Sequence, residues 1–121
     1  MRILEKDLLD SEHILVKTFF NAISDSKFIN VVKHMSLGIG YGSNDTVCTF
    51  PDDLDPGDEI FDGVEFSLIN EAVIVDYRTF YHYLKLACKV YVRDFPKDED
   101  TIKGYLDKIA DKYNLIDLEA E

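Results

Sequence analysis

Carboxylates crowded into the middle of the chain are the residues with the clearest chemical potential. Between Lys33 and Arg78 the sequence contains no lysine or arginine, so no cation close in sequence can pair them. Charged side chains are almost never fully buried without a counter-charge, so these carboxylates bind a hard cation, face a cationic partner or stay in solvent. We predict a partner-binding surface made of the seven most crowded acidic residues: Asp52, Asp53, Asp55, Asp58, Glu59, Asp62 and Glu65.

A calcium site is one alternative for these carboxylates, because calcium takes six to eight oxygen ligands. The EF-hand register fails here. With Asp53 and Asp55 at the first and third loop positions, glycine would be needed at Asp58 instead of at Gly57. A metal-dependent hydrolase and a plain solvated loop, the usual role of a charge run, both stay open. We expect no metal and no cofactor.

Two tyrosines form a second candidate contact. Tyr77 and Tyr81 lie four residues apart in a predicted helix, and residues at this spacing share one helix face. Tyrosine is enriched at protein interfaces because it combines contact area with a polar tip. We expect these two rings to flank the acidic surface, with ordinary packing as the alternative.

Catalytic motifs find little support in the sequence. The two cysteines form no CxxC motif, and the histidines lie on separate predicted helices: His13, His34 and His82. Such spacing gives no zinc site and no nucleophile–base pair. The glycines from Gly38 to Gly42 follow a helix and lack the Gly-Lys-Ser/Thr of a phosphate loop, which indicates a plain loop. We do not expect an enzyme.

The composition is typical of a small acidic globular protein. Its 121 residues suit one domain, over residues 1–121, and 46% hydrophobic residues supply a core without a disulfide. A net charge of −11 argues against direct nucleic-acid binding through phosphates. No apolar run approaches the ~20 residues of a membrane span, and the N-terminus has no signal-peptide pattern. We expect a cytoplasmic protein that does not bind membranes.

Hydrophobic periodicity predicts an α+β domain with N-terminal helices, a small antiparallel sheet in the middle and C-terminal helices. The first helix is expected to begin at Ser11 as its N-cap, and a second follows the break at residues 24–26. A third is expected from about Tyr77 to Pro96, and a fourth follows Asp98.

The middle third has the period of strands. Residues 46–50 are β-branched and aromatic, and residues 64–68 alternate between apolar and polar. After a turn at Asn70 and Glu71, residues 72–75 are expected to return as the antiparallel partner. Gly63 is predicted to mark a β-bulge. The crowded carboxylates therefore fall mainly in the loop between two strands.

Part of the chain resembles a known family. The residues that carry the resemblance are Phe61-Asp-Gly-Val-Glu-Phe66, Ala72-Val-Ile-Val75, Phe80-Tyr-His-Tyr-Leu-Lys-Leu-Ala-Cys88 and Pro96. They are similar to the immunity proteins of bacterial contact-dependent growth inhibition systems, in the branch that neutralises ribonuclease toxins. The resemblance implies a cytoplasmic, cofactor-free, non-enzymatic protein that binds the C-terminal nuclease domain of its cognate toxin. Contact residues differ between toxin–immunity pairs, so the resemblance implies none here.

The acidic surface agrees with that expectation on separate grounds. A nuclease presents lysine and arginine to attract phosphates, and carboxylates complement such a surface. Composition alone fits any basic partner, and the resemblance narrows the partner to a nuclease toxin. A small acidic adaptor or regulator that binds another basic protein is the alternative function.

Overall fold

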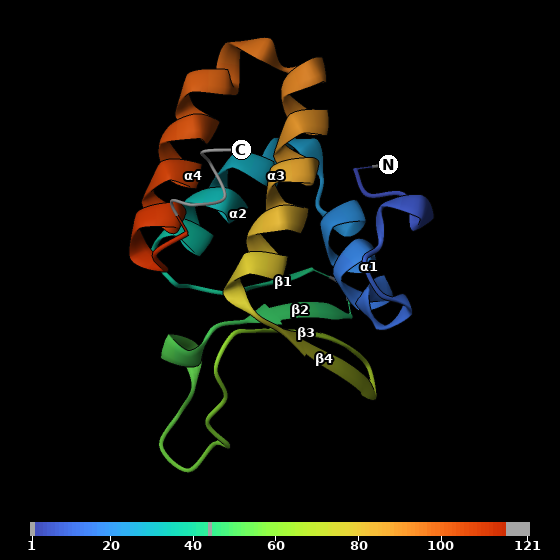
Figure 1. Cartoon of the computed structure of the whole chain (residues 1–121), viewed down its shortest axis with the longest axis vertical. Coiled ribbons are helices and arrows are strands. Elements are labelled where there is room, and N and C mark those ends of the chain that lie inside the picture. Colours follow the sequence, from blue (N-terminus) through green and yellow to red (C-terminus); the bar gives the residue numbers. More distant parts are fainter. Residues whose placement is uncertain (1, 44, 116–121) are drawn as a thin grey trace.

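A computed structural model describes residues 2–43 and 45–115 of the chain. Four α-helices cover one face of a single sheet, and the α+β prediction is confirmed (Figure 1). The helices are α1 (Ile14–Ala22), α2 (Asp25–Ser36), α3 (Tyr77–Asp94) and α4 (Glu99–Lys112). The strands are β1 (Tyr41–Ser43), β2 (Thr46–Thr49), β3 (Val64–Leu68) and β4 (Glu71–Val75).

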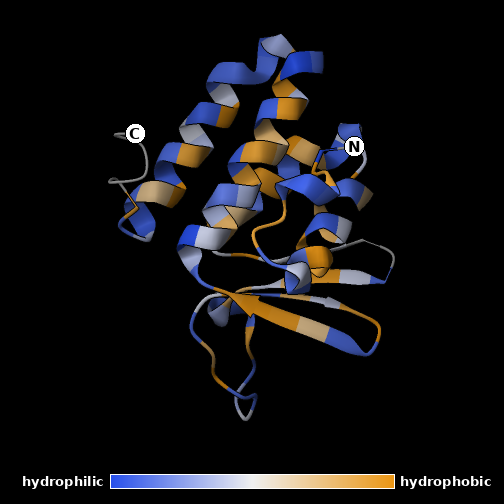
Figure 2. Cartoon of the chain, turned by 45° about the vertical axis from the view of Figure 1, so that its right-hand side comes forward, coloured by the Kyte–Doolittle hydropathy of each residue, from blue (hydrophilic) through white to orange (hydrophobic). Residues whose placement is uncertain are grey.

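The four strands form an antiparallel meander in the order β1-β2-β3-β4. The four α-helices lie on one side of this sheet (Figure 1). Cys48 pairs with Phe66, and both are buried on the helix-covered face. Along β2, β3 and β4, the residues that alternate with those of the buried face point to the opposite, uncovered face of the sheet: Val47, Thr49, Glu65, Ser67, Ala72 and Ile74. Figure 2 shows the apolar strand β4 at the open edge of the sheet.

Strand β1 was not expected. The sequence predicts a plain loop for the glycine run, whereas Tyr41 pairs with Cys48 and Gly42 with Val47. The chain approaches β2 so closely that a Cβ atom at Gly40 would collide with the carbonyl oxygen of Cys48. Glycine is needed there for close backbone contact, a role distinct from a flexible turn.

Helix α3 begins where the acidic residue before it caps the backbone. The Asp76 carboxylate accepts a hydrogen bond of 2.7 Å from the Thr79 amide, which lowers the pKa of Asp76. A similar cap precedes α1, where Asp10 accepts from the Glu12 amide at 2.9 Å. Ser11, the predicted cap, instead begins a short 3-10 helix (Ser11–His13).

The core between the sheet and the helices is rich in aromatic rings. Phe66 of β3 lies 5.4 Å from Phe19 and 6.4 Å from Phe80, measured between ring centroids. Edge-to-face and tilted pairs of this kind add stability beyond the burial of their area. Both cysteines are buried in this core, and burial raises the pKa of Cys88 to about 12. These thiols act as small hydrophobic groups.

The turn between β3 and β4 holds a strained residue. Leu68 pairs with Glu71, so the turn consists of Ile69 and Asn70, one residue earlier than predicted. Ile69 has a φ of 53° and its side chain is 75% exposed. A β-branched residue in this region is a steric outlier, because its Cβ crowds the backbone.

We expect Ile69→Gly to stabilise the protein. Glycine takes positive φ without that steric cost, so the free energy of unfolding should rise by on the order of 1 kcal/mol. Tm should then rise by about 4 °C, as measured by differential scanning calorimetry. Ile69→Val is the matched control because it keeps the branched Cβ, and it should bring no gain. A glycine variant that melts at or below the wild-type Tm would contradict the strain.

Candidate functional site

The predicted partner surface lies on a loop that projects from one end of the sheet. A short 3-10 helix, η3 (Pro51–Asp53), follows β2, and the chain then runs to β3 without further regular structure. We call residues 52–63 the acidic loop. Figures 1 and 2 show this loop extending beyond the sheet, away from the helices. Its carboxylates are exposed: Asp52, Asp53, Asp55, Asp58, Glu59 and Asp62.

Two of these carboxylates hold the loop in shape. One oxygen of Asp53 accepts hydrogen bonds from the amides of Phe50, at 2.8 Å, and Gly40, at 2.9 Å. Asp58 accepts from the amide of Asp55 at 2.8 Å. Asp53 therefore ties the base of the loop to the segment before β1, and Asp58 closes a turn near its tip. Both carboxylates have a structural role that spacing did not reveal.

The other predicted acidic residues carry no side-chain hydrogen bond or ion pair among the residues that the structure describes. Asp55, Glu59 and Asp62 are exposed along the loop. Glu65 lies in β3, opposite Thr49 and Ile74, on the uncovered face of the sheet. Ile60, 87% exposed, adds an apolar side chain in the middle of these carboxylates. This combination suits contact with another protein.

Tyr77 lies beside the loop but is tied down. Its ring stacks on Tyr113 with centroids 4.0 Å apart and planes at 10°. Burial raises the pKa of Tyr77, a hydrogen bond from the Gly63 backbone opposes that shift, and the charges of Asp62 and Asp52 add to it. Tyr77 is half-buried and joins the start of α3 to the end of the acidic loop.

Tyr81 does not lie on the surface. Its side chain is 1% exposed, so the expectation that it flanks an exposed interface is wrong. The i, i+4 spacing correctly puts Tyr77 and Tyr81 on one helix face, but that face of α3 also belongs to the core. The buried residues of α3 cover more of its circumference than a narrow stripe, because they include Phe80, Tyr81, Tyr83, Leu84, Ala87, Cys88 and Tyr91.

Within residues 2–43 and 45–115, no group of three or more His, Cys, Asp or Glu residues is placed to hold a metal ion. His13 hydrogen-bonds the Tyr83 hydroxyl at 2.8 Å, and that hydroxyl also accepts from the Leu9 amide. His13 therefore contacts a buried tyrosine of α3 and lies away from the acidic loop.

Comparison with known families decides the kind of protein. A family model described as CDI immunity protein, where CDI is contact-dependent growth inhibition, matches residues 12–106. The chain belongs to the CDI immunity protein family. The match covers the whole sheet, the acidic loop and most of the helices. A comparison with curated proteins found no match. As a CDI immunity protein, the chain has the role of protecting against a CDI toxin.

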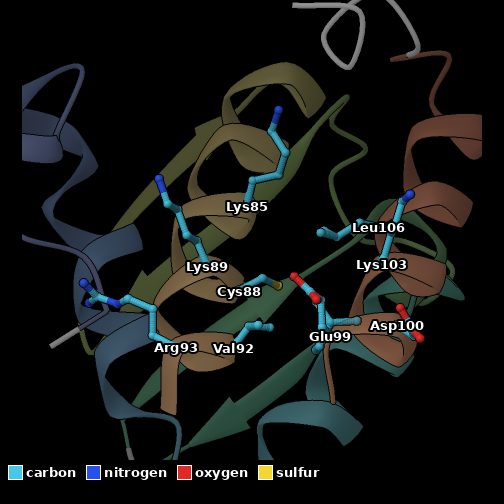
Figure 3. A pocket seen from close by; sticks show the side chains of 10 residues that line it. Lys85, Cys88, Lys89, Val92, Arg93, Glu99, Asp100, Lys103 and Leu106 are labelled. Atoms are coloured by element: carbon cyan, nitrogen blue, oxygen red, sulfur yellow. The ribbon is translucent and has the colours of Figure 1, made fainter. Parts of the chain in front are cut away.

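This immunity protein also has a groove between α3 and α4, at the end of the molecule away from the sheet. The groove has a volume of about 720 Å³, with Cys88 and Val92 among its lining residues (Figure 3). Its basic residues are Lys85, Lys89, Arg93 and Lys103, and Glu99 and Asp100 also line it. The spacing of Lys85, Lys89 and Arg93, four residues apart, is the signal in the sequence that marks this helix face. The charges of the groove are mixed, unlike those of the acidic loop.

In the part of the chain that the structure describes, none of the helices has the length and the apolar character needed to cross a bilayer.

Proposed function

We propose that this immunity protein binds the C-terminal nuclease domain of its cognate toxin and neutralises it through the acidic loop. From the resemblance in sequence, we infer that the nuclease is a ribonuclease. The protein acts in the cytoplasm by binding alone, without catalysis and without a cofactor. The observation that carries the proposal is the set of exposed carboxylates on the acidic loop, which form no ion pair within the described residues.

Charge distribution over the fold supports this proposal. Every lysine and arginine lies before residue 34 or after residue 77, so the whole sheet and the acidic loop contain none. The helices carry the positive charges, and the loop and the uncovered face of the sheet carry only negative ones. A basic partner is attracted to that end of the molecule, while an acidic partner or nucleic acid is repelled from it.

A nuclease domain has the complementary property. Its cleft must attract phosphate groups, so it presents lysine and arginine side chains. Carboxylates on an inhibitor meet that same field and raise the association rate to roughly 10⁸–10⁹ M⁻¹s⁻¹ at low salt. Rapid capture suits an inhibitor that must act before the toxin cuts its substrate.

A growth competition tests the function directly. Cells that express this protein should survive contact with cells that deliver the toxin encoded immediately upstream, and the two proteins should co-purify. Protection against other nuclease toxins should be weak, because loop surfaces vary readily and near relatives leave unpaired charges. Death of the expressing cells would contradict the immunity role. Protection against many different nuclease toxins would contradict the proposal that the binding surface is specific for one toxin.

Salt dependence tests the role of charge. The Debye length falls from about 30 Å at 0.01 M to about 8 Å at 0.15 M, so long-range attraction to the acidic loop should weaken steeply. We expect the association rate, measured by stopped flow, to fall by about 10-fold or more over this range of salt concentration. The dissociation rate should change less, because buried contacts are poorly screened. If the association rate did not change with salt, the charge of the acidic loop would serve solubility and would not attract the toxin.

A further inference from the structure

A second acidic feature lies at the opposite end of the β3–β4 hairpin from the acidic loop. A cavity of about 500 Å³ opens between the start of α1 and the first residues of β4. This volume falls in the range of ligand pockets, about 300–1,000 Å³. Its lining comes from two segments far apart in sequence, residues 12–15 and residues 70–73.

The lining of this cavity combines apolar walls with two carboxylates. Ile14 and Val73 supply apolar surface, and Ile14 is exposed to solvent. Glu12 and Glu71 are both exposed and belong to different segments. The only ion pair among the described residues joins Arg2 to Asp25, so neither glutamate has a cationic partner there.

Arginine is the side chain that such a cavity fits. Its apolar stem packs against aliphatic walls while its charged head reaches carboxylates. A planar guanidinium carries five donors and can hydrogen-bond more than one carboxylate, whereas an ammonium is a compact point charge. Arginine is also one of the residues that most often dominate binding energy when inserted into a partner's pocket.

We propose that this cavity is an anchor pocket for one arginine side chain of the toxin, with Glu12 and Glu71 binding its guanidinium. The inference rests on the proposed function and extends it to a second contact. Strand β3 has five residues and spans about 14 Å, which separates the pocket from the end of the acidic loop. One interface of ordinary size, about 800 Å² on each partner, covers both.

A second copy of this chain, docked through the same end of the molecule, is a poor partner for this pocket because of its charge. The β4 edge and the adjoining acidic loop carry no lysine or arginine, so two such ends repel each other. A basic partner meets carboxylates at both ends of the hairpin and apolar residues, Ala72 and Ile74, along the open edge. The charge at this end therefore selects a cationic protein.

Titration with a small probe tests the pocket without the toxin. N-acetyl-arginine amide should shift the backbone amide signals of Glu71, Ala72 and Val73 in a saturable way, on the order of 1–10 mM by NMR. The isosteric but uncharged citrulline derivative and the lysine derivative should bind at least about five-fold more weakly. Glu12→Gln with Glu71→Gln should abolish the saturable shifts, and the matched control, Glu59→Gln on the acidic loop, should leave them unchanged.

The toxin supplies the second arm of the experiment. The Glu12→Gln/Glu71→Gln variant should release the toxin domain encoded upstream at least about ten-fold faster, with a smaller change in association rate. Equal shifts with all three probes, or shifts spread over every acidic residue, would overturn the arginine pocket. Saturable arginine binding together with wild-type release of the toxin would overturn its place in the interface. Failure of the wild-type protein to bind the toxin would instead contradict the proposed function.

Discussion

Replacing Asp55, Glu59 and Asp62 together by lysine should abolish protection against the cognate toxin. Each substitution changes an exposed carboxylate into a like charge facing the toxin's basic residues. Loss of one partner of a desolvated charge pair typically costs about 2–5 kcal/mol, so the toxin Kd should rise by roughly 100-fold or more. Growth competition and surface plasmon resonance measure the two effects. Wild-type protection by this variant would show that the acidic loop is a solvated surface.

The choice of residues follows from the hydrogen bonds within the loop. Asp53 and Asp58 are left intact because they accept backbone amides, and their loss would disturb the loop itself. The matched control reverses three exposed carboxylates of the helices: Asp94, Asp100 and Asp107. Asp98 is excluded from it because it accepts a hydrogen bond from the Tyr91 hydroxyl at 2.8 Å. Circular dichroism of both variants should match the wild type, and the control should protect fully.

Gly63→Ala should be the most destabilising single substitution among the glycines with positive φ. Gly63 has a φ of +121°, and a Cβ atom there would collide with the carbonyl oxygen of Val75. Backbone strain and steric overlap together should lower the free energy of unfolding by on the order of 3–5 kcal/mol. Chemical denaturation with urea measures this loss as a lower midpoint with an unchanged slope.

Two other glycines separate the causes of that loss. Gly57 has a φ of +98° but nothing within 4 Å of its Cβ position, so Gly57→Ala should cost only about 1 kcal/mol of strain. Gly104 lies inside α4 with open space around it, and Gly104→Ala should stabilise the protein by roughly 0.5–1 kcal/mol. If Gly57→Ala and Gly63→Ala lowered the free energy of unfolding equally, the predicted collision with the Val75 carbonyl oxygen would be contradicted.

The elements with long periodic patterns were predictable from the sequence. The stripes of α1 to α4 and the alternation in β3 place these elements where the structure has them. Strand β1 was not predictable, because its three residues include a glycine and its pairing depends on β2 alone. The bulge prediction at Gly63 is wrong, since the first pair of the ladder is Val64 with Val75 and Gly63 precedes it. Its positive φ serves the entry of the chain into β3.

The candidate site was predictable in position and less so in detail. A run of carboxylates without lysine or arginine marks the acidic loop in the sequence, but it does not distinguish carboxylates without hydrogen bonds from those that accept backbone amides. Pro51 begins a 3-10 helix and Asp53 is its third residue. At this position an acidic side chain accepts a hydrogen bond from the amide of the residue just before the helix. Tyr81 was misplaced because the width of a buried helix face depends on the elements that cover it.

The order of the strands bears on how soon a cell is protected. Each strand pairs with the strand next to it in sequence, so the sheet assembles from contacts between nearby segments. Proteins dominated by such local contacts fold faster than those that must join distant parts of the chain, with mixed α/β domains intermediate between helical bundles and β-sandwiches. In this domain the sheet is the local part, whereas the packing of α2 against α4 joins segments far apart in sequence. We therefore expect the sheet that carries the acidic loop to form early in a bacterium that begins to express this gene, and protection to wait for the helices to pack.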